Sequence, residues 1–474
     1  MSKTKNPKRQ KLRNNEYYDF QKVQDELYAK SKNGYIFKNL MDKIISEANI
    51  LLAYRNIKKN NGSNTKGADG KTIANLAKLE TKDLVMLVRN KLKNFQPQKV
   101  RRVEIPKPDG KKRPLGIPTI SDRLVQQCIL QVMEPICEAK FYKHSYGFRP
   151  LRSTKHAIAR AYHLAQKANL HYVVDVDIKG FFDNIDHGKL LKQIWTLGIR
   201  DKSLLAVISK LLKAEIEGIG IPTKGTPQGG IISPLLANIA LNEYDHWIKS
   251  QWEEMVTNHE YIGSKRADGS VSLANKRNAL KKTNLKEVYI VRYADDFKLF
   301  CRNHTDAVKI FEATKKWLKE RLKLDVSPEK SRIVNLRKNY SDFLGIKLKV
   351  TKKRKDRHNR DKFVVQSQIG NKAYQVIITT IRKRAKELQK PKDNKGAKTV
   401  NAFNSYILGV HNYYSCATNC NLDFAKIAFI TRSTLKNRLP LRKKNANDKI
   451  PKYMEKSYGN SKQLRFLYDT PMLP

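Results

Sequence analysis

The chain has 474 residues, of which 40% are hydrophobic, and 95 Lys+Arg against 44 Asp+Glu give it a formal net charge of +51. This length predicts about three domains, and the hydrophobic content excludes wholesale disorder. The charge indicates a polyanionic partner, and because the sequence has neither a long apolar run nor a signal-peptide-like segment, nucleic acid is favoured over an acidic membrane surface.

The cysteines are too few for a disulfide framework in a chain of this length, which fits a reducing compartment. They are Cys128, Cys137, Cys301, Cys416 and Cys420. Cys416 and Cys420 would share one face if that segment is helical, so a metal site is one alternative for this pair. No second cysteine pair and no suitably spaced histidine cluster accompanies them, so buried thiols are the favoured interpretation.

The N-terminal region begins with a basic arm, because residues 1 to 14 contain six Lys or Arg and no acid. Apolar residues then recur every three to four positions from Glu16 to Asn56, which predicts a helix that ends near Lys58. Residues 58 to 70 hold three glycines among polar residues and are expected to form a loop. Its lysines Lys58, Lys59 and Lys66 suit phosphate groups, while composition equally allows a plain surface loop.

Residues 101 to 118, RRVEIPKPDGKKRPLGIP, predict a basic hairpin, because Pro-Asp-Gly separates two extended arms. Such a hairpin can fold over a triphosphate, with Lys107 and Arg113 on its two arms, and the plainer alternative is nonspecific contact with phosphates. A helix with Ser121 as its N-cap is expected to follow.

Residues 171 to 187, HYVVDVDIKGFFDNIDH, predict a strand that is buried on at least one face. The two-residue period of a strand places Asp175 and Asp177 on the same face, and two acids on a buried strand require cations. Phe181 and Phe182 follow within a few residues, where an aromatic ring can pack under a sugar.

The segment GTPQGGIISP, residues 225 to 234, predicts the start of a helix with Ser233 as N-cap and Pro234 at the first helical position. Its glycines allow another backbone or a nucleotide to approach closely. Residues 249 to 287 are polar and rich in lysine, and we expect them to be an insertion at a loop.

Residues 288 to 300, VYIVRYADDFKLF, predict two short strands joined by a tight turn at Ala294-Asp295, with Asp295 and Asp296 at the tip. A solvated turn is the ordinary explanation of such a pair. Two like charges in apolar surroundings, however, are tolerated mainly when a cation neutralises them, and a divalent metal is the obvious candidate.

The remaining chain is expected to contain an amphipathic helix from Asp306 to Leu322 and short strands up to Ile346. Residues 351 to 400 contain 16 Lys+Arg and 4 Asp+Glu, about twice the average charge density of the chain. Residues 403 to 439 predict a helical region with several aromatic side chains, which suit RNA stacking but more often pack in a core.

Five separated motifs together resemble the reverse transcriptases that are encoded within group II introns. In chain order they are GFRPLRS from Gly147, DIKGFFDNIDH from Asp177, TPQGGIISPLLANIALNEYD from Thr226, YADD from Tyr293 and FLGIKL from Phe343. The resemblance runs from about Ile44 to the C-terminus, and the stretch ILGVHNYYSCATN, residues 407 to 419, is similar to the maturase or thumb domain of that family.

The resemblance implies an α+β fold of the right-hand polymerase type, with fingers, a palm that contains an antiparallel sheet, and a helical thumb. The implied domains are a basic arm and N-terminal extension (1–95), fingers and palm (96–350), a thumb/maturase domain (351–445), and a basic C-terminal segment (446–474) that begins a DNA-binding region. Two features depart from the family: Ile231-Ile232 replaces a pair such as Pro-Leu, and the sequence has no Cys- and His-rich HNH endonuclease cluster. Second-strand cleavage by this chain is therefore not expected, although a longer natural protein is not ruled out by the sequence.

The resemblance also implies roles for individual residues. The catalytic carboxylates would be Asp177, Asp295 and Asp296, with Asp177, Ile178 and Asp295 binding two Mg²⁺ ions; the role of Asp175 is left open. The incoming dNTP would contact Lys107, Arg113, Phe182 and Gln228, where Phe182, rather than Phe181, would exclude a 2′-hydroxyl. Lys330 would support the primer or palm, and the basic residues Arg382, Lys383 and Arg384 would join the loop lysines in binding RNA.

The function implied is an RNA-directed DNA polymerase that binds its intron RNA, promotes its splicing and copies it into DNA during intron mobility. Its partners would be the intron RNA, an RNA template, a DNA primer or target, and dNTPs, in a bacterial cytoplasm or in an organelle, with the oligomeric state left open. Two alternatives are a non-catalytic RNA-binding splicing factor with a polymerase fold, and a related polymerase in antiviral or CRISPR defence. Loss of one acid would have favoured the first alternative, but all three acids are present.

Overall fold

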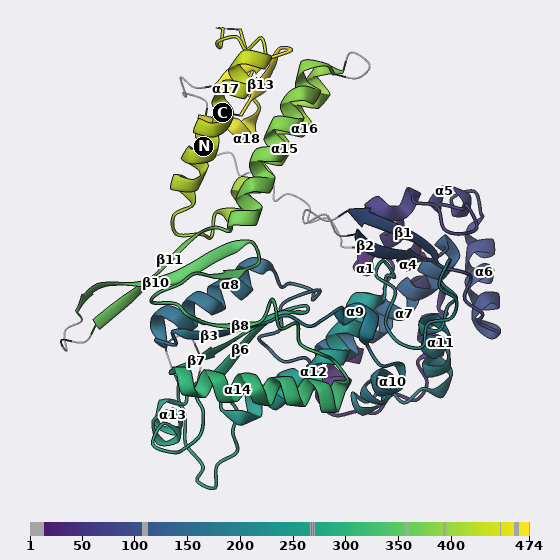
Figure 1. The fold of residues 1–474 in the computed structure, drawn as a ribbon. Helices are drawn as coiled ribbons and strands as arrows, with labels where there is room; N and C mark the ends of the chain where they lie inside the picture. The colour runs from purple at the N-terminus through teal and green to yellow at the C-terminus, as the bar shows by residue number, and fades with distance from the viewer. Residues whose placement is uncertain are drawn as a thin grey trace, which may run out of the picture. The chain divides into compact units, whose positions relative to one another are not determined.

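A computed structural model of the chain (Figure 1) describes residues 14–473, apart from 107–111, 266, 268, 270, 356–358, 360, 392–394, 446 and 459–463. The chain divides into two compact units. The first unit comprises residues 1–153, 175–299 and 305–332, and the second comprises residues 154–174, 300–304 and 333–474. Among the described residues, no helix has both the length and the apolar composition that a membrane crossing requires.

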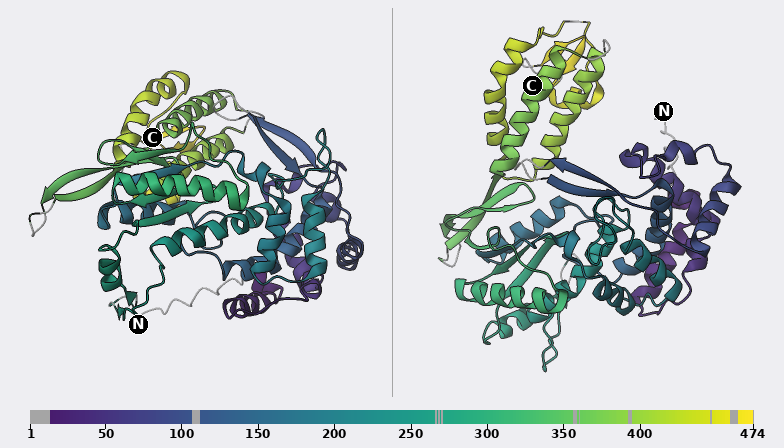
Figure 2. Two further views of the ribbon diagram at one scale, coloured as in Figure 1. Left: turned by 60° about the horizontal axis from the view of Figure 1, so that its bottom comes forward. Right: turned by 45° about the vertical axis from the view of Figure 1, so that its right-hand side comes forward.

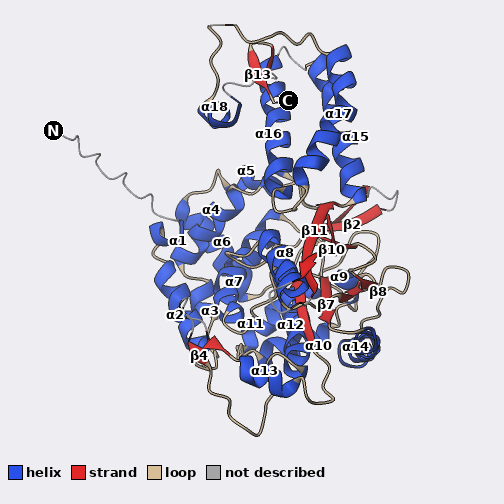
Figure 3. Ribbon diagram, turned by 90° about the vertical axis from the view of Figure 1, so that its left-hand side faces the viewer, coloured by secondary structure: helices blue, strands red, loops and turns tan. Residues whose placement is uncertain are grey.

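The first unit begins with several short helices (Figure 3), so the helical pattern from Glu16 to Asn56 is interrupted, while the predicted helix end at Lys58 is confirmed. These are α1 (Asn14–Tyr17), α2 (Gln21–Lys32), α3 (Met41–Ile44) and α4 (Glu47–Lys58). The break has a tertiary cause. The amide of Phe37 donates to the carbonyl of Gly198 (2.8 Å), and Phe37 in turn accepts from the amide of Arg200 (2.7 Å). Pairing with a segment far along the chain therefore overrides the local helical pattern.

The loop after α4 is fixed to a long helix, α7 (Ile120–Glu138), of the same unit. It contains the single turn η1 (Asn61–Asn64) and leads to α5 (Ile73–Leu76) and α6 (Thr81–Lys93). The guanidinium of Arg123 in α7 donates to the carbonyls of Gly62 (2.9 Å) and Thr65 (2.7 Å). The N-cap of α7 is Thr119 and not Ser121, because the Thr119 hydroxyl accepts a hydrogen bond from the Asp122 amide.

The basic hairpin is confirmed as an antiparallel pair, β1 (Arg101–Pro106) and β2 (Lys112–Ile117). Its predicted turn, together with Lys107, lies outside the described residues. Arg113, on the second arm, pairs with Ile105 in the ladder.

A four-stranded sheet of order β6-β7-β3-β8 carries the acidic motifs. Its strands are β6 (Val288–Tyr293), β7 (Asp296–Cys301), β3 (Tyr172–Val176) and β8 (Arg332–Asn335). Strands β6 and β7 are consecutive and β3 lies beside β7, so the order brings residues more than a hundred positions apart onto neighbouring strands. Both YADD strands are almost wholly buried, which agrees with their apolar composition.

The segments of the chain that connect these strands contain several helices of the first unit. They are α9 (Phe181–Asn184), α10 (His187–Thr196), α11 (Lys202–Leu212), α12 (Ser233–Gln251) and α14 (His304–Trp317), which ends in the π-helical turn η3 (Leu318–Leu322). Helix α12 packs on β6 and on α10. Its N-cap is Ile232, so the expected Ser233 cap is wrong; the Ser233 hydroxyl instead donates to the carbonyl of Pro227 (2.8 Å) and is committed to the preceding turn.

The polar segment from 249 to 287 begins inside α12 and contains β4 (Ser264–Lys265), β5 (Val271–Ser272) and α13 (Ala274–Leu280). Trp252 anchors its start, because this side chain is 1% exposed and its indole N–H donates to the hydroxyl of Tyr289 (3.1 Å).

The second unit begins with α8 (Thr154–Tyr162) and the π-helical turn η2 (His163–Lys167). It continues with β9 (Ser341–Phe343) and a long antiparallel hairpin (Figure 2) of β10 (Ile346–Lys355) and β11 (Asp361–Ile369). The domain boundary expected near residue 351 lies within β10.

Three long helices follow the hairpin: α15 (Asn371–Gln389), α16 (Gly396–Tyr414) and α17 (Cys420–Arg438). Cys416 lies in the turn before α17 and not in a helix. The condition for a helical face shared with Cys420 is therefore not met. The chain ends with α18 (Lys452–Tyr458) and the strand pair β12 (Arg465–Leu467) and β13 (Thr470–Met472).

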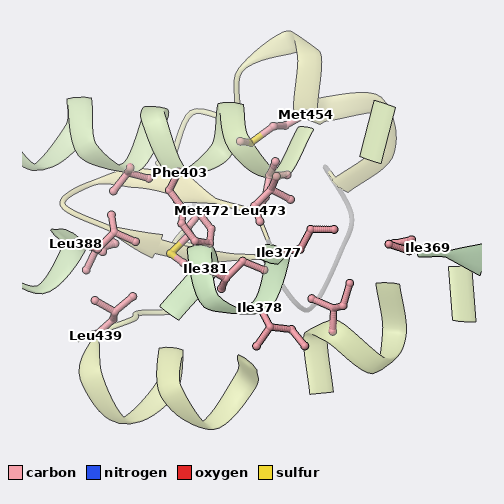
Figure 4. Close-up of a cluster of buried hydrophobic side chains, with 14 residues drawn as sticks. Ile369, Ile377, Ile378, Ile381, Leu388, Phe403, Leu439, Met454, Met472 and Leu473 are labelled. Atoms are coloured by element: carbon pink, nitrogen blue, oxygen red, sulfur yellow. The ribbon is translucent and has the colours of Figure 1, made fainter. Parts of the chain in front are cut away.

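The C-terminal segment belongs to the core of the second unit (Figure 4), where Met454, Met472 and Leu473 pack with Phe403 of α16. The Asn404 side chain fixes this arrangement, because it donates to the carbonyl of Pro471 (2.7 Å) and accepts from the amide of Leu473 (2.9 Å). Truncation before residue 454 would thus expose apolar surface of α15 and α16.

The second unit contains a buried histidine, His171, whose two ring nitrogens both have partners. His171 is 1% exposed; one ring nitrogen lies 3.1 Å from the carbonyl of Ala165, and the other accepts from the Nε–H of Arg337 (2.8 Å). Burial, together with Arg337, lowers the pKa of His171 to about 4. The neutral ring is therefore the form that the fold stabilises.

We expect the unfolding free energy of the second unit to fall as the pH drops below about 6.5, with a total loss of roughly 3 kcal/mol once the pH is below 4. Stability falls in acid because the histidine of the unfolded chain, with its ordinary pKa, binds a proton at a higher pH than the buried His171 of the folded chain does. Urea titrations at pH 7.5 and pH 5 measure the effect, and His171→Gln should flatten the pH dependence. An equally steep dependence in the variant would show that other groups cause it.

Candidate active site

Four aspartates meet where β3 and the β6–β7 hairpin lie side by side. Asp175 belongs to β3 and Asp177 follows its end, while Asp295 lies in the turn and Asp296 is the first residue of β7. The turn at Ala294-Asp295 agrees with the sequence prediction. Ala294 has a φ of +58°, a left-handed conformation that costs a non-glycine residue about 1 kcal/mol or more.

Asp175 is neutralised by a lysine that sequence reasoning missed. The ammonium of Lys298 in β7 donates to Asp175 Oδ1, and Lys298 is only 2% exposed. Arg332 Nε lies 3.8 Å from the other carboxylate oxygen. Asp175 is thus held in a buried ion pair, which distinguishes it from its neighbour Asp177. The available signal was a lysine alternating with apolar residues in the strand FKLF.

Asp177 is more accessible and is held by its backbone. Its amide donates to the hydroxyl of Ser331 (3.0 Å), and its carbonyl accepts from the amide of Ser327 (2.8 Å). Ile178 forms an antiparallel bridge with Val326. The ammonium of Lys330 lies 3.3 Å from Asp177 Oδ2, and both side chains are exposed. The segment from 325 to 331 therefore fixes the position of Asp177 and leaves its carboxylate free to exchange partners.

The two acids of the turn resist ionisation. Burial raises the pKa of Asp295, and the nearby Asp177 adds to this, while Arg113 and Arg292 act in the opposite direction. Burial also raises the pKa of Asp296 to about 6, with Lys298 opposing the shift and Asp175, Asp295 and Asp177 adding to it. Asp296 is exposed as a whole residue, so the burial that raises its pKa comes from protein atoms around the carboxylate and not from complete enclosure of the residue.

This electrostatic arrangement suits a bound cation. Within the part of the chain that the structure describes, no three His, Cys, Asp or Glu side chains are already arranged as metal ligands. The donor set nevertheless fits a hard divalent metal, because it consists of carboxylates and because their mutual repulsion would be relieved by positive charge. Lys330 supplies part of that charge at Asp177.

A fully buried arginine holds the turn in place, and sequence reasoning missed it. Arg292 is 1% exposed and forms a two-pronged ion pair with Asp245 of α12, at 2.8 Å and 2.6 Å. Its third nitrogen donates to the carbonyl of Ala294 (2.8 Å) and to Asn238 (3.0 Å). The strained Ala294 is therefore tied directly to α12.

The GFRP motif supports the same turn from another side. The Asn238 amide donates to the carbonyl of Gly147 (2.8 Å). A Cβ atom at Gly147 would lie only 2.2 Å from the backbone nitrogen of Ala294, so no side chain fits at this position. The first and fourth of the five motifs are thus in backbone contact.

The glycine-rich PQGG segment and β2 form a second close contact. Gly229 has a φ of +123°, and a Cβ atom there would lie 2.5 Å from the carbonyl oxygen of Gly116. The Gly116 amide donates to the carbonyl of Gln228 (2.8 Å), and Arg113 Nε donates to the Gln228 side chain (2.7 Å). Two of the predicted dNTP contacts, Arg113 and Gln228, are therefore brought together.

Phe182 lies in an aromatic cluster. Its side chain is 8% exposed, and its ring makes edge contacts with Phe181 and with Phe148 of the GFRP motif. Phe148 is 48% exposed and has a φ of +55°. Sequence reasoning missed Phe148, although an aromatic residue inside a recognised motif was a usable signal.

The predicted RNA contacts form two separate sets. Lys58, Lys59 and Lys66 are exposed in the first unit. Arg382 and Lys383 are exposed on α15 of the second unit, whereas the guanidinium of Arg384 stacks on the ring of Tyr406. Their role in RNA binding stays a prediction.

Comparisons with known proteins point to one family. A family model described as "Reverse transcriptase (RNA-dependent DNA polymerase)" matches residues 105–348, a range that includes all four aspartates. The chain is 30% identical over 439 residues to the group II intron-encoded protein LtrA of Lactococcus lactis, covering 81% of this chain and 72% of that protein. It is 35% identical over 305 residues to protein YkfC of Escherichia coli, covering 60% and 76%. A 91 kDa protein in the cob intron of Schizosaccharomyces pombe is 29% identical over 474 residues, covering 88% and 56%.

Proposed function

This chain belongs to the reverse transcriptase family, among the group II intron-encoded proteins, and we propose that Asp177, Asp295 and Asp296 are its catalytic carboxylates. It is an RNA-directed DNA polymerase of the intron-encoded type, and nucleic acid is its partner. The observation that carries the assignment is the convergence of a strained two-acid turn with Asp177, where burial and like charge raise the pKa of both turn acids.

A polymerase of this family uses a divalent metal, and we propose two Mg²⁺ ions held by Asp177, Asp295 and the backbone at Ile178. When bound, the ions would supply charge stabilisation at the attacking and leaving oxygens of phosphoryl transfer. The chain's own residues prepare the site. The ion pair with Lys298 would keep the Asp175 carboxylate from serving as a metal ligand, and Lys330 would neutralise part of the charge of Asp177 when no metal is bound.

The nucleotide-binding roles follow from the contact between β2 and the PQGG segment. Arg113 would bind the triphosphate, with Lys107 assigned to it from the sequence alone, and Gln228 would lie along the nascent base pair. Phe182 would exclude a 2′-hydroxyl, because its ring is held by Phe181 and Phe148 and has little freedom to move aside.

The biological role that best fits the family is maturation and mobility of the intron that encodes the chain. We propose that residues 1–95 form the basic arm and N-terminal extension, 96–350 the fingers and palm, 351–445 the thumb of a right-hand polymerase, and 446–474 the start of a DNA-binding region. Met454, Leu467, Met472 and Leu473 of this last segment pack in the core of the second unit. RNA would contact the exposed lysines after α4 and the cations of α15. A bacterial cytoplasm is the proposed compartment. The comparisons do not favour the splicing factor without polymerase activity or the defence-associated polymerase.

Primer extension tests the function directly. With a DNA primer annealed to an RNA template, we expect dNTP incorporation in Mg²⁺ and a loss on the order of 10³-fold when EDTA removes divalent metal, because the repelling carboxylates cannot stabilise the reacting phosphate alone. Adding Mg²⁺ back should restore activity. Binding of RNA, measured in the same EDTA buffer, serves as the control. Extension that is equally fast in EDTA would refute the proposed chemistry.

A further inference from the structure

One hollow of the first unit shares no residue with the candidate active site. It has a volume of about 600 Å³, within the range of ligand-binding pockets. Its walls come from the segment after α2, from α10 and from α12, and its lining includes Tyr35, Lys140, Lys192, Arg200 and Glu243.

Hydrogen bonds fix the shape of this pocket. The segments of residues 35–41 and 198–201 are joined by the pairing of Phe37 with Gly198 and Arg200. The carboxylate of Asp201, 3% exposed, accepts from the amides of Leu40 (2.6 Å) and Met41 (3.3 Å). The pocket is therefore preformed, which lowers the cost of ordering it on binding.

The one carboxylate in the lining is already committed. Glu243 accepts from Lys189 (2.8 Å), Arg321 (2.7 Å) and the Gln193 amide (3.0 Å). Burial opposes its ionisation, but these hydrogen bonds outweigh burial and lower the pKa of Glu243. Glu243 stays ionised at neutral pH, and its negative charge is already neutralised by the two cations that contact it, Lys189 and Arg321. It therefore does not neutralise the other cations of the lining.

Three further cations of the lining are not neutralised by a carboxylate of the described residues. Among the described residues, Lys140, Lys192 and Arg200 form no ion pair with a carboxylate. Lys140 and Arg200 are only partly exposed, and the buried Nε of Arg200 has no hydrogen-bond partner within the described protein. The Arg200 guanidinium lies over the ring of Trp195, 5.5 Å from the ring centre, in a cation–π contact. Partly buried cations without partners call for an anion.

We propose that this pocket is a phosphate-ester site that takes a backbone phosphate of bound RNA, with Lys140, Lys192 and Arg200 as its ligands. A planar guanidinium together with two ammonium groups can donate several charge-assisted hydrogen bonds to the oxygens of one phosphate. Tyr35, which is 53% exposed, lines the pocket, and the Lys30 ammonium lies over its ring, 5.4 Å from the ring centre, so an aromatic and cationic surface borders the phosphate site. The same chemistry would accept the phosphate of a free nucleotide. The RNA assignment rests on the proposed function, whereas the phosphate site itself does not.

The test measures binding without polymerisation. A short fluorescein-labelled single-stranded RNA is titrated with the full chain at several KCl concentrations, using the wild type, the double variant Lys140→Gln/Arg200→Gln and the single variant Lys192→Gln. The matched control is Lys281→Gln/Lys282→Gln, which removes two exposed lysines of the polar insertion. Adenosine monophosphate is added as a competitor in a second arm. Tm values establish that each variant is folded, and Lys192, which is exposed, gives a variant with little risk to the fold.

We expect the double pocket variant to bind RNA about tenfold more weakly and to lose about 1 to 1.5 from the slope of log affinity against log salt, since each phosphate contact to a single strand contributes about 0.7. The Lys281/Lys282 control should change much less. If adenosine monophosphate competes with RNA for the wild type but not for the double variant, the pocket binds a terminal phosphate. If adenosine monophosphate does not compete, the pocket binds a phosphate of the RNA backbone. Equal losses in the pocket and control variants, or no loss in either, would overturn the site. The pocket effect should persist in a chain that carries Asp296→Asn, so failure of the polymerase assignment is separable from failure of the pocket.

Discussion

Asparagine at position 296 or 295 is expected to lower primer extension on an RNA template by on the order of 10³-fold, while RNA affinity stays within about twofold of the wild type. The substitution preserves shape and removes only the negative charge that a metal requires. Asp177→Asn should have the same effect. The Asp177 carboxylate follows the neighbouring strand β3 and lies close enough to Asp295 to raise its pKa.

The three variants should remain folded. Removing one of several mutually repelling carboxylates relieves repulsion, so Tm is not expected to fall. Asp42→Asn, at an exposed acid of α3, is the matched control and should retain full extension. An Asp296 or Asp295 variant that extends primers at the wild-type rate would remove these acids from the chemistry, whatever family the chain belongs to.

The local parts of this site were predictable from the sequence. The alternation of apolar residues around Asp295 predicts two strands and a turn, and the Pro-Asp-Gly segment predicts the β1–β2 hairpin. Both signals are short-range, because strand periodicity and turn chemistry act over a few residues. The pairing of the turn with the strand before Asp177 required the resemblance to a family, since periodicity does not state which strands are neighbours.

The supports of the site were not predictable in this way. Lys298 lies 123 positions from its partner Asp175, and Arg292 lies 47 positions from Asp245. Each of these residues appears in the sequence only as a charge in an apolar stretch, and its partner is set by the tertiary fold. The same reason explains the helix break after α2, which depends on contact with residues 198–201.

Helix starts show a related limit. Ser121 and Ser233 are both good N-cap residues by type, yet the caps are Thr119 and Ile232. The Ser233 hydroxyl is used by the carbonyl of Pro227, and this tightens the glycine-rich turn that places Gln228 next to Arg113. The general preference for serine at a helix N-cap therefore does not hold at Ser233, whose hydroxyl is already bonded to the carbonyl of Pro227 in the preceding turn.

Arg292 is the position where we expect the second large effect. Arg292→Lys should lower kcat by about tenfold to a hundredfold, because a single ammonium nitrogen cannot reproduce the two-pronged contact with Asp245 and at the same time keep the bond to the carbonyl of Ala294 in place. We expect the resulting small displacement of Asp295 to be costly for catalysis. Arg292→Met should in addition lose roughly 3 to 5 kcal/mol of stability, since it leaves Asp245 charged and buried without a partner.

The double variant Arg292→Met/Asp245→Leu separates positioning from stability. Replacing both members of a buried ion pair by apolar side chains of similar size is often neutral or stabilising, so the double variant should regain most of the Tm lost by Arg292→Met. It still lacks a donor for the carbonyl of Ala294, so its kcat should stay low while the KM for dNTP changes little. Recovery of both Tm and kcat in the double variant would show that the ion pair stabilises the fold and has no part in aligning the turn. A low kcat at restored Tm would instead identify the bond from Arg292 to Ala294 as the link through which α12 positions the two turn acids.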